Sequence, residues 1–158
     1  LYDVSADKSP PQFWGDKDPL DVRWSDTLAL LRDSAPEIPV TVWCNEDAPL
    51  IWGQIMREMA GLPTMAPLDG EFDLLETIMR PEGMKRFKSY LASHPEMTTA
   101  EHPRVIAAFL DKYVIDDALE EELDMPSWTE ELVEEMTEVY DEDVARIQEI
   151  PGVRVILP

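Results

Sequence analysis

The segment 39–62, PVTVWCNEDAPLIWGQIMREMAGL, constrains the fold of this chain more than any other part of the sequence. Residues 40–43 are strand formers with little polar alternation, which is typical of a strand buried on both faces of a sheet. A helix with an apolar stripe follows at once, with Asp47 suited to its N-cap, Pro49 to its first turn and Gly61 to its end. Another helix is predicted just before the strand. A buried strand with a helix on each side of it in the sequence is typical of parallel strand pairing.

The remaining periodic stretches predict a helix-rich α/β chain, in which part of a parallel sheet is flanked by helices. The first helix takes Ser25 as its N-cap. We expect about six helices, over 25–35, 48–60, 72–79, 81–93, 98–114 and 127–150, and a second strand over 153–157. An isolated pair of strands is only marginally stable, so either the helices supply most of the packing or further strands belong to another part of the protein.

Composition divides the chain into two parts. Residues 1–24 begin without an initiator Met, are rich in proline and show no sustained periodicity, so they are expected to be an irregular segment of the kind that connects parts of a longer protein. Residues 25–158 contain the expected helices and strands. By their length they are interpreted as belonging to a single α/β domain.

The net charge limits the partners of the chain. Thirteen basic and 34 acidic side chains give a formal charge of −21, which repels DNA, RNA and anionic membranes. We interpret the acidic runs as solvated helix surfaces, and the alternative is a face that binds a basic protein or a second copy of the chain. These runs are residues 116–117, 120–122, 130–131, 134–135 and 141–143.

Cysteine and histidine are too rare for a structural zinc site, because Cys44, His94 and His102 are the only residues of these types. The aspartates of 16–21 lack the glycine and the distal glutamate of an EF-hand, so no metal is expected. A single cysteine forms no internal disulfide, which favours a reducing cytoplasm. No apolar run approaches the roughly 20 residues that span a bilayer, and no signal peptide is recognisable.

Two groups of charged residues are candidates for a site. Glu46 and Asp47 follow the buried strand, and ligands of open α/β sheets gather outside the carboxyl ends of strands. A carboxylate there can act as a general base or position a ligand hydroxyl, and the alternative is that both residues favour the positive end of the following helix. The second group could contact an anion, or could form salt bridges with the acidic helices. It consists of Arg80, Lys85, Arg86 and Lys88.

A phosphate-binding loop is absent from the sequence. No G-x-x-x-x-G-K-[ST] motif occurs in the 158 residues, and the six glycines are not clustered. Such a loop cradles nucleotide phosphates with its backbone N–H groups, so a nucleotide bound here would need its phosphates held by other means. We therefore expect no cofactor to be held by this chain alone.

The pattern of 40–62, a hydrophobic strand, E-D, a nearby proline and a helix ending in G-L, resembles the sulfotransferase family. There a strand ends in Y-E-D-L, and a helix closing near F-L-G-L follows. Residues 139–156, VYDEDVARIQEIPGVRVI, also resemble the helix and closing segment of bacterial sulfotransferase-like proteins. The resemblance implies that the chain is the C-terminal portion of such a protein, with residues 25–158 as the C-terminal part of a single sulfotransferase-like domain. It also implies a P-loop-like parallel sheet flanked by helices, as in nucleotide kinases.

The resemblance also implies a reaction, the transfer of a sulfuryl group from 3′-phosphoadenosine 5′-phosphosulfate (PAPS) to a hydroxyl or amine. In the family, a phosphosulfate loop and an Arg and Ser pair bind the donor, and both precede the E-D strand, so they would belong to an upstream segment. The family's residue before E-D approaches the adenine, which makes Asn45 and Glu46 the implied donor contacts. We expect this chain alone to be inactive, and the alternative is a non-catalytic acidic interaction protein.

Overall fold

The computed structural model describes residues 18–115 and 128–158, and these form two compact units. The described part of the first unit comprises 18–42 and 128–155, and that of the second comprises 43–115 and 156–158. Six α-helices accompany a two-stranded parallel sheet in these residues, which confirms the helix-rich α/β class. Most of the Pro-rich segment predicted for 1–24 lies outside the described residues.

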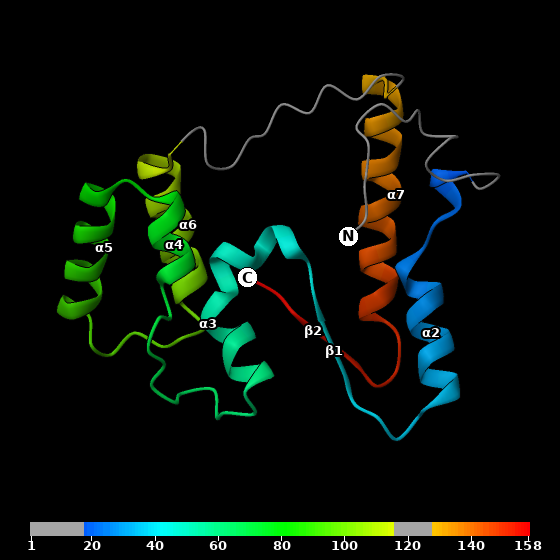
Figure 1. Ribbon diagram of the computed structural model, residues 1–158, viewed down its shortest axis with the longest axis horizontal. Helices are drawn as coiled ribbons and strands as arrows, with labels where there is room; N and C mark the ends of the chain where they lie inside the picture. The colour runs from blue at the N-terminus through cyan, green and yellow to red at the C-terminus, as the bar shows by residue number, and fades with distance from the viewer. Residues whose placement is uncertain (1–17, 116–127) are drawn as a thin grey trace, which may run out of the picture. The chain divides into compact units, whose positions relative to one another are not determined.

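Each predicted helix and strand has a counterpart in the structure, although the helix predicted over 98–114 begins only at His102 (Figure 1). The first unit contains the 3-10 turn η1 (Pro19–Asp21) and the helices α2 (Trp24–Ser34) and α7 (Glu130–Gln148). The second contains the 3-10 turn η2 (Asn45–Asp47) and the helices α3 (Ala48–Met59), α4 (Asp73–Ile78), α5 (Pro81–Ser93) and α6 (His102–Tyr113). The strands are β1 (Val40–Trp43) and β2 (Val153–Ile156), and the chain passes from one unit to the other within each of them.

In the first unit, α2 and α7 lie side by side (Figure 1) and are joined by a buried carboxylate. Asp143 of α7 is only 3% exposed, and it accepts the N–H groups of Trp24 at 2.6 Å and of Ser25 at 3.2 Å. The Ser25 hydroxyl donates to the same carboxylate. Asp143 therefore caps the N-terminus of α2 from another helix. The prediction that Ser25 is the N-cap was wrong, because this carboxylate satisfies the first N–H groups and Arg23 occupies the capping position.

Arg32 organises the turns that lead into the two strands. Its guanidinium donates to the carbonyl oxygens of Pro36, at 2.6 Å, and Ile38, just before β1. Its Nε donates at 3.3 Å to the carbonyl oxygen of Pro151, just before β2. Gly152 follows with φ +81°, and a Cβ at that position would lie 2.5 Å from the Arg32 guanidinium. One side chain therefore holds the beginnings of both strands in place.

The strand pair is less covered than the sequence pattern predicted. All four residues of β1 are half-buried, so the expectation of burial on both faces was wrong. The physical reason is that the described sheet has two strands, so β1 has one neighbouring strand. At the end of β2, Ile156 is 5% exposed and packs with Ala48, Ile51 and Ile55 of α3.

The main core of the second unit centres on Phe87 of α5, which is completely buried. Phe72 and Phe109 meet its ring edge-on, with ring centroids 5.0 and 5.5 Å away. Helices α5 and α6 approach so closely that a Cβ on Gly83 would overlap the Cβ of Tyr113. The other buried members of this core are Leu75, Ile78, Met79, Met84 and Ile106. Aromatic packing and one glycine thus fix the spacing of these two helices.

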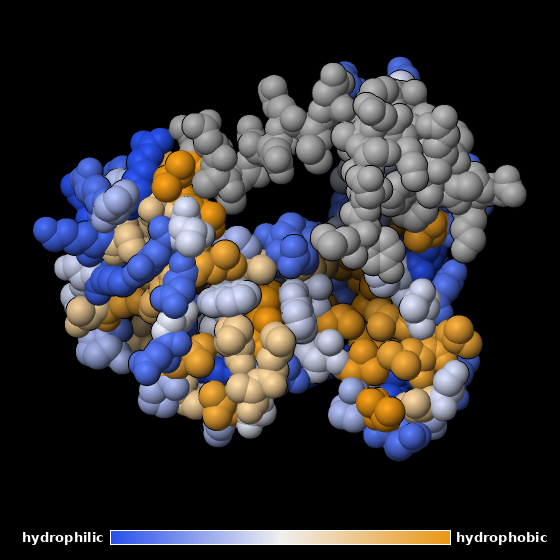
Figure 2. All heavy atoms as spheres, viewed as in Figure 1, coloured by the Kyte–Doolittle hydropathy of each residue, from blue (hydrophilic) through white to orange (hydrophobic). Residues whose placement is uncertain are grey.

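Hydrophobic side chains reach the surface over α2, where Figure 2 shows a patch of orange, whereas the surface over α5 is largely blue. Trp24, Leu30 and Leu31 are 64%, 68% and 43% exposed. Across 18–115 and 128–158, no helix combines the length and apolar character needed to cross a membrane.

We predict that Asp143→Ala lowers the free energy of unfolding by about 3 kcal/mol, because the substitution removes the acceptor of two backbone N–H groups and a buried hydroxyl. Urea denaturation followed by tryptophan fluorescence measures this loss. Asp141→Ala is the matched control, because Asp141 is an exposed residue of the same helix, and we expect its effect to stay within about 0.5 kcal/mol. Equal losses for the two variants would show that Asp143 is not a structural cap.

Candidate functional site

The predicted strand-end site forms an exposed polar turn. Asn45, Glu46 and Asp47 make up η2, which begins two residues after the end of β1 and leads directly into α3. The side chains of Asn45 and Glu46 are exposed, and Asp47 is half-buried. Burial raises the pKa of Asp47, and the neighbouring charge of Glu46 raises it further. Asp47 occupies the N-cap of α3 as predicted, but its side chain makes no capping hydrogen bond. Its carboxylate is therefore not committed to the helix terminus.

The four basic residues of the predicted cluster do not converge on one point. Arg86 pairs with Glu82 at 2.8 Å, and Lys88 pairs with Glu76. Arg80 precedes α5, and its backbone N–H donates to the carbonyl oxygen of Tyr113. Lys85 lies exposed on α5. Arg86 and Lys88 thus pair with carboxylates of α5 and α4, and not with the acidic runs that the alternative interpretation named.

A buried ion pair that the sequence analysis missed joins three segments of the second unit. Arg57 of α3 is 5% exposed and donates to Glu71 at 2.9 Å and to the carbonyl oxygen of Ala66 at 2.8 Å. His102 of α6 lies near the same carboxylate, with 3.8 Å between Nδ1 and the Glu71 oxygen. Gly53 leaves room for this contact, because a Cβ there would lie 2.7 Å from the Glu71 oxygen. The four-residue spacing of Gly53 and Arg57 is the only local signal of this arrangement.

Burial decides the protonation state of His102. Burial lowers the pKa of the ring, and the positive charge of Arg57 lowers it further, whereas the charges of Glu71 and Glu101 oppose the shift. The 3.8 Å contact therefore joins a carboxylate to a mostly neutral imidazole near pH 7. A cavity of about 20 Å³ adjoins these groups and holds at most one water molecule. Arg57, Glu71 and His102 consequently act as a structural lock between α3, the following loop and α6.

A larger cavity lies between α5 and α6, with a volume of about 460 Å³. Arg86 is the one member of the predicted basic cluster among its lining residues, and Lys112 supplies a second cation from α6. The sequence analysis did not single out Lys112. The helical spacing of Ala108 with Lys112 and of Phe109 with Tyr113 places both pairs on neighbouring positions of α6, but the facing helix is not readable from that pattern.

No group of three His, Cys, Asp or Glu residues within 18–115 and 128–158 is arranged to hold a metal ion. Comparisons with protein-family models, with curated protein sequences and with solved structures gave no match. A function for this chain is therefore inferred from its own residues and from the resemblance of its strand-turn-helix segment.

We predict that Glu71→Gln destabilises the protein by about 2 kcal/mol, because the buried guanidinium of Arg57 loses its counter-charge while an amide oxygen still accepts its hydrogen bond. Chemical denaturation measures the change. Glu82→Gln is the matched control, since it breaks an ion pair of similar length whose side chains are 60% and 68% exposed, and we expect a loss below about 0.5 kcal/mol. The lock is refuted if the two variants lose equal stability.

We predict that the imidazole of His102 titrates below the ordinary histidine pKa of about 6.5, because burial opposes its charge. The unfolded chain then binds a proton at a higher pH than the folded chain. The contribution of His102 is therefore complete above about pH 6.5 and is lost as the pH falls through the folded value. An NMR titration of the ring protons measures the midpoint, and a midpoint at or above 6.5 would contradict the prediction.

Proposed function

We propose that this chain is the C-terminal portion of a sulfotransferase-like protein, and that the complete protein transfers a sulfuryl group from PAPS to a hydroxyl or amine. The observation that carries the proposal is the order of elements around β1. This strand pairs in parallel with β2, and the turn Asn45–Asp47 and helix α3 follow its carboxyl end. Ligands of open α/β sheets bind outside the carboxyl ends of parallel strands, which is where residues of a ligand site are expected. The turn after β1 supports the proposal for this reason.

The surroundings of the strands support a sheet that continues in another part of the protein. Parallel sheets are normally covered on both faces, and two strands alone are marginally stable. Here β1 is half-buried along its length, and the helix that precedes it carries exposed Trp24 and Leu30. Additional strands and helices from the same protein would cover such surfaces.

In this proposal the chain supplies one edge of the donor site. The phosphate groups of PAPS would be bound by upstream residues, because the 158 residues contain no phosphate-loop motif. Asn45 stands where the family carries an aromatic residue, and its exposed amide both donates and accepts hydrogen bonds. The amide would therefore contact the polar edge of the adenine instead of stacking on its face, with Glu46 beside it.

The first test uses the protein from its natural source, captured with an antibody raised against this chain. We expect an intact mass well above 18.1 kDa, because the donor loop would be part of the same polypeptide. The captured full-length protein should bind 3′-phosphoadenosine 5′-phosphate, the product of the donor, in a calorimetric titration. Asn45→Ala in that protein should weaken binding about fivefold to tenfold, which corresponds to one hydrogen bond.

Glu96→Gln is the control for this titration, because Glu96 is exposed and lies far along the chain from the strand-end turn. It should leave the affinity unchanged. An intact mass of 18.1 kDa together with an absence of nucleotide binding would contradict the proposal. That result would favour the alternative function, in which the acidic helices associate with a basic partner and salt weakens the association.

A further inference from the structure

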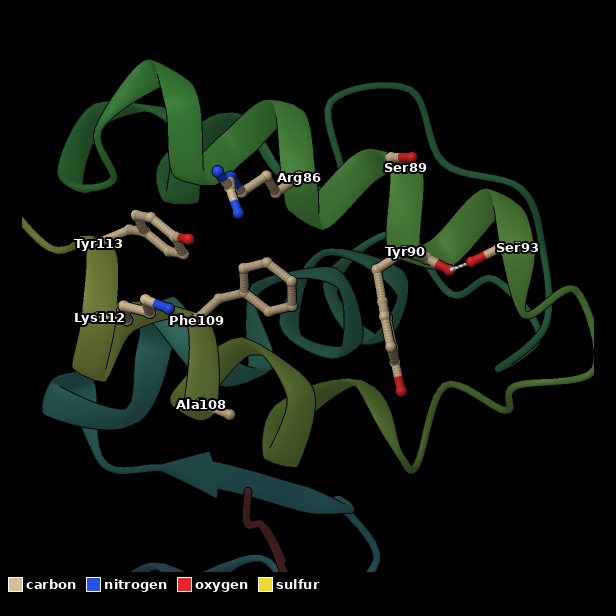
Figure 3. A pocket seen from close by; sticks show the side chains of 8 residues that line it. All are labelled: Arg86, Ser89, Tyr90, Ser93, Ala108, Phe109, Lys112 and Tyr113. Atoms are coloured by element: carbon tan, nitrogen blue, oxygen red, sulfur yellow. Dashed lines mark hydrogen bonds between the residues drawn. The ribbon is translucent and has the colours of Figure 1, made fainter.

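The cavity between α5 and α6 has the size of a small-molecule site. Its volume of about 460 Å³ falls within the range of roughly 300–1,000 Å³ that is usual for ligand pockets. Figure 3 shows that side chains of both helices line it. Helix α5 contributes Arg86, Ser89, Tyr90 and Ser93, and helix α6 contributes Ala108, Phe109, Lys112 and Tyr113. Both helices belong to the second unit and enclose its aromatic core, so the cavity has a rigid frame.

The charge of the cavity is opposite to that of the chain. Acidic residues outnumber basic ones by 34 to 13, yet the lining residues within the described part of the chain include two cations and no carboxylate. The guanidinium carbon of Arg86 lies 5.8 Å from the ring centre of Tyr113, and Nζ of Lys112 lies 5.6 Å from the same centre. In Figure 3 these two cations lie on either side of that ring. An anionic group near Tyr113 would therefore lie in the positive potential of both cations.

The carboxylate that pairs with Arg86 does not block this role. Glu82 lies one helical turn before Arg86, and the two side chains are 68% and 60% exposed. An exposed pair of this kind contributes little net stability, so an anionic ligand competes with it readily. Lys112 is also exposed, and its side chain contacts the face of Tyr113. Both cations thus remain accessible from the solvent.

Aromatic rings form the apolar wall. Phe109 lies between Tyr90 and Tyr113, with ring centres 5.9 and 6.1 Å away, and its other contact is the buried Phe87. Tyr90 is held in turn by stacking on His94 at 4.1 Å. These contacts fix the rings before any ligand arrives, which lowers the entropic cost of binding. The planes of the Tyr90 and Phe109 rings are inclined by 59°, so a ligand ring can stack on one of them and meet the other edge-on.

We propose that this cavity binds a small aromatic anion, a planar ring that carries a phosphate, sulfate or carboxylate group. The ligand ring packs against Phe109 and Tyr90, and its anionic group lies beside Tyr113, where Arg86 and Lys112 supply positive charge. The cavity is open and its cations are exposed, so the expected dissociation constant is about 0.1 to 1 mM. This inference stands independently of the sulfuryl-transfer proposal, because no residue of the strand-end turn lines the cavity.

The test is a titration of the full chain with phenyl phosphate, followed by NMR of the backbone amides. We expect saturable shifts in α5 and α6, and an affinity at least tenfold higher than those for phenol and for inorganic phosphate. Phenol supplies the ring alone and inorganic phosphate the charge alone. Equal affinities for phenyl phosphate and inorganic phosphate, or shifts that do not saturate, would overturn the proposal. Phenyl sulfate and benzoate in the same assay rank the three anionic groups.

Two double variants distinguish binding in the cavity from general attraction of the ligand to positive charge on the two helices. Arg86→Gln with Lys112→Gln should weaken phenyl phosphate binding at least tenfold. Lys85→Gln with Arg104→Gln removes one cation from each of the same two helices, at exposed positions outside the lining, and should change the affinity less than twofold. Equal weakening by the two double variants would show that the cavity has no specific role.

Two single variants keep the proposal testable if the double variant is unstable. Lys112→Gln changes an exposed residue, so the fold should persist, and we expect a threefold or greater loss of affinity. Tyr90→Ala removes part of the aromatic wall, and the preference for phenyl phosphate over inorganic phosphate should fall. An unchanged affinity in Lys112→Gln, or an unchanged preference in Tyr90→Ala, counts against the site.

Discussion

The need to pair buried charge governs the packing of both units. Ser25, Arg57 and Asp143 are the buried polar and charged residues of the described chain, and each belongs to a network that joins separate segments. Asp143 fastens α7 to the start of α2, and Arg57 fastens α3 to the loop before α4. A buried charge without a partner costs several kcal/mol, so these networks exclude most alternative arrangements of the helices.

These contacts also place the two candidate sites. Arg32 hydrogen-bonds to the turns before β1 and β2, which pair in parallel. Asn45 and Glu46 follow the carboxyl end of β1. In the second unit, neither Arg57 nor Glu71 lines the cavity between α5 and α6, and the spacing of those two helices is set by the contact of Gly83 with Tyr113. The strand-end turn and the cavity thus depend on different interactions, and a change in one need not disturb the other.

Local signals in the sequence predicted the elements well. The run of strand formers at 40–43, together with Pro49, Gly61 and Pro81, marked boundaries that the structure reproduces. Strand propensity, the missing N–H of proline and the positive φ of glycine all act within a few residues. Contacts between distant segments were not predictable. The cap that Asp143 provides for α2 spans more than a hundred residues, so nothing near Ser25 indicates it. The half-burial of β1 likewise depends on its neighbours and not on its own pattern.

The same limit applies to the candidate sites. Arg80, Lys85, Arg86 and Lys88 were grouped because they are close in sequence, yet their side chains do not converge. Arg86 instead lines the cavity together with Lys112 of α6. The chain has only 13 basic side chains, so the position of each one indicates its role. Arg32 and Arg57 hydrogen-bond to backbone carbonyls and stabilise the fold, whereas Arg86 and Lys112 keep their charges exposed beside aromatic rings. Exposed cations that no fold contact requires are the groups best placed to recognise an anion.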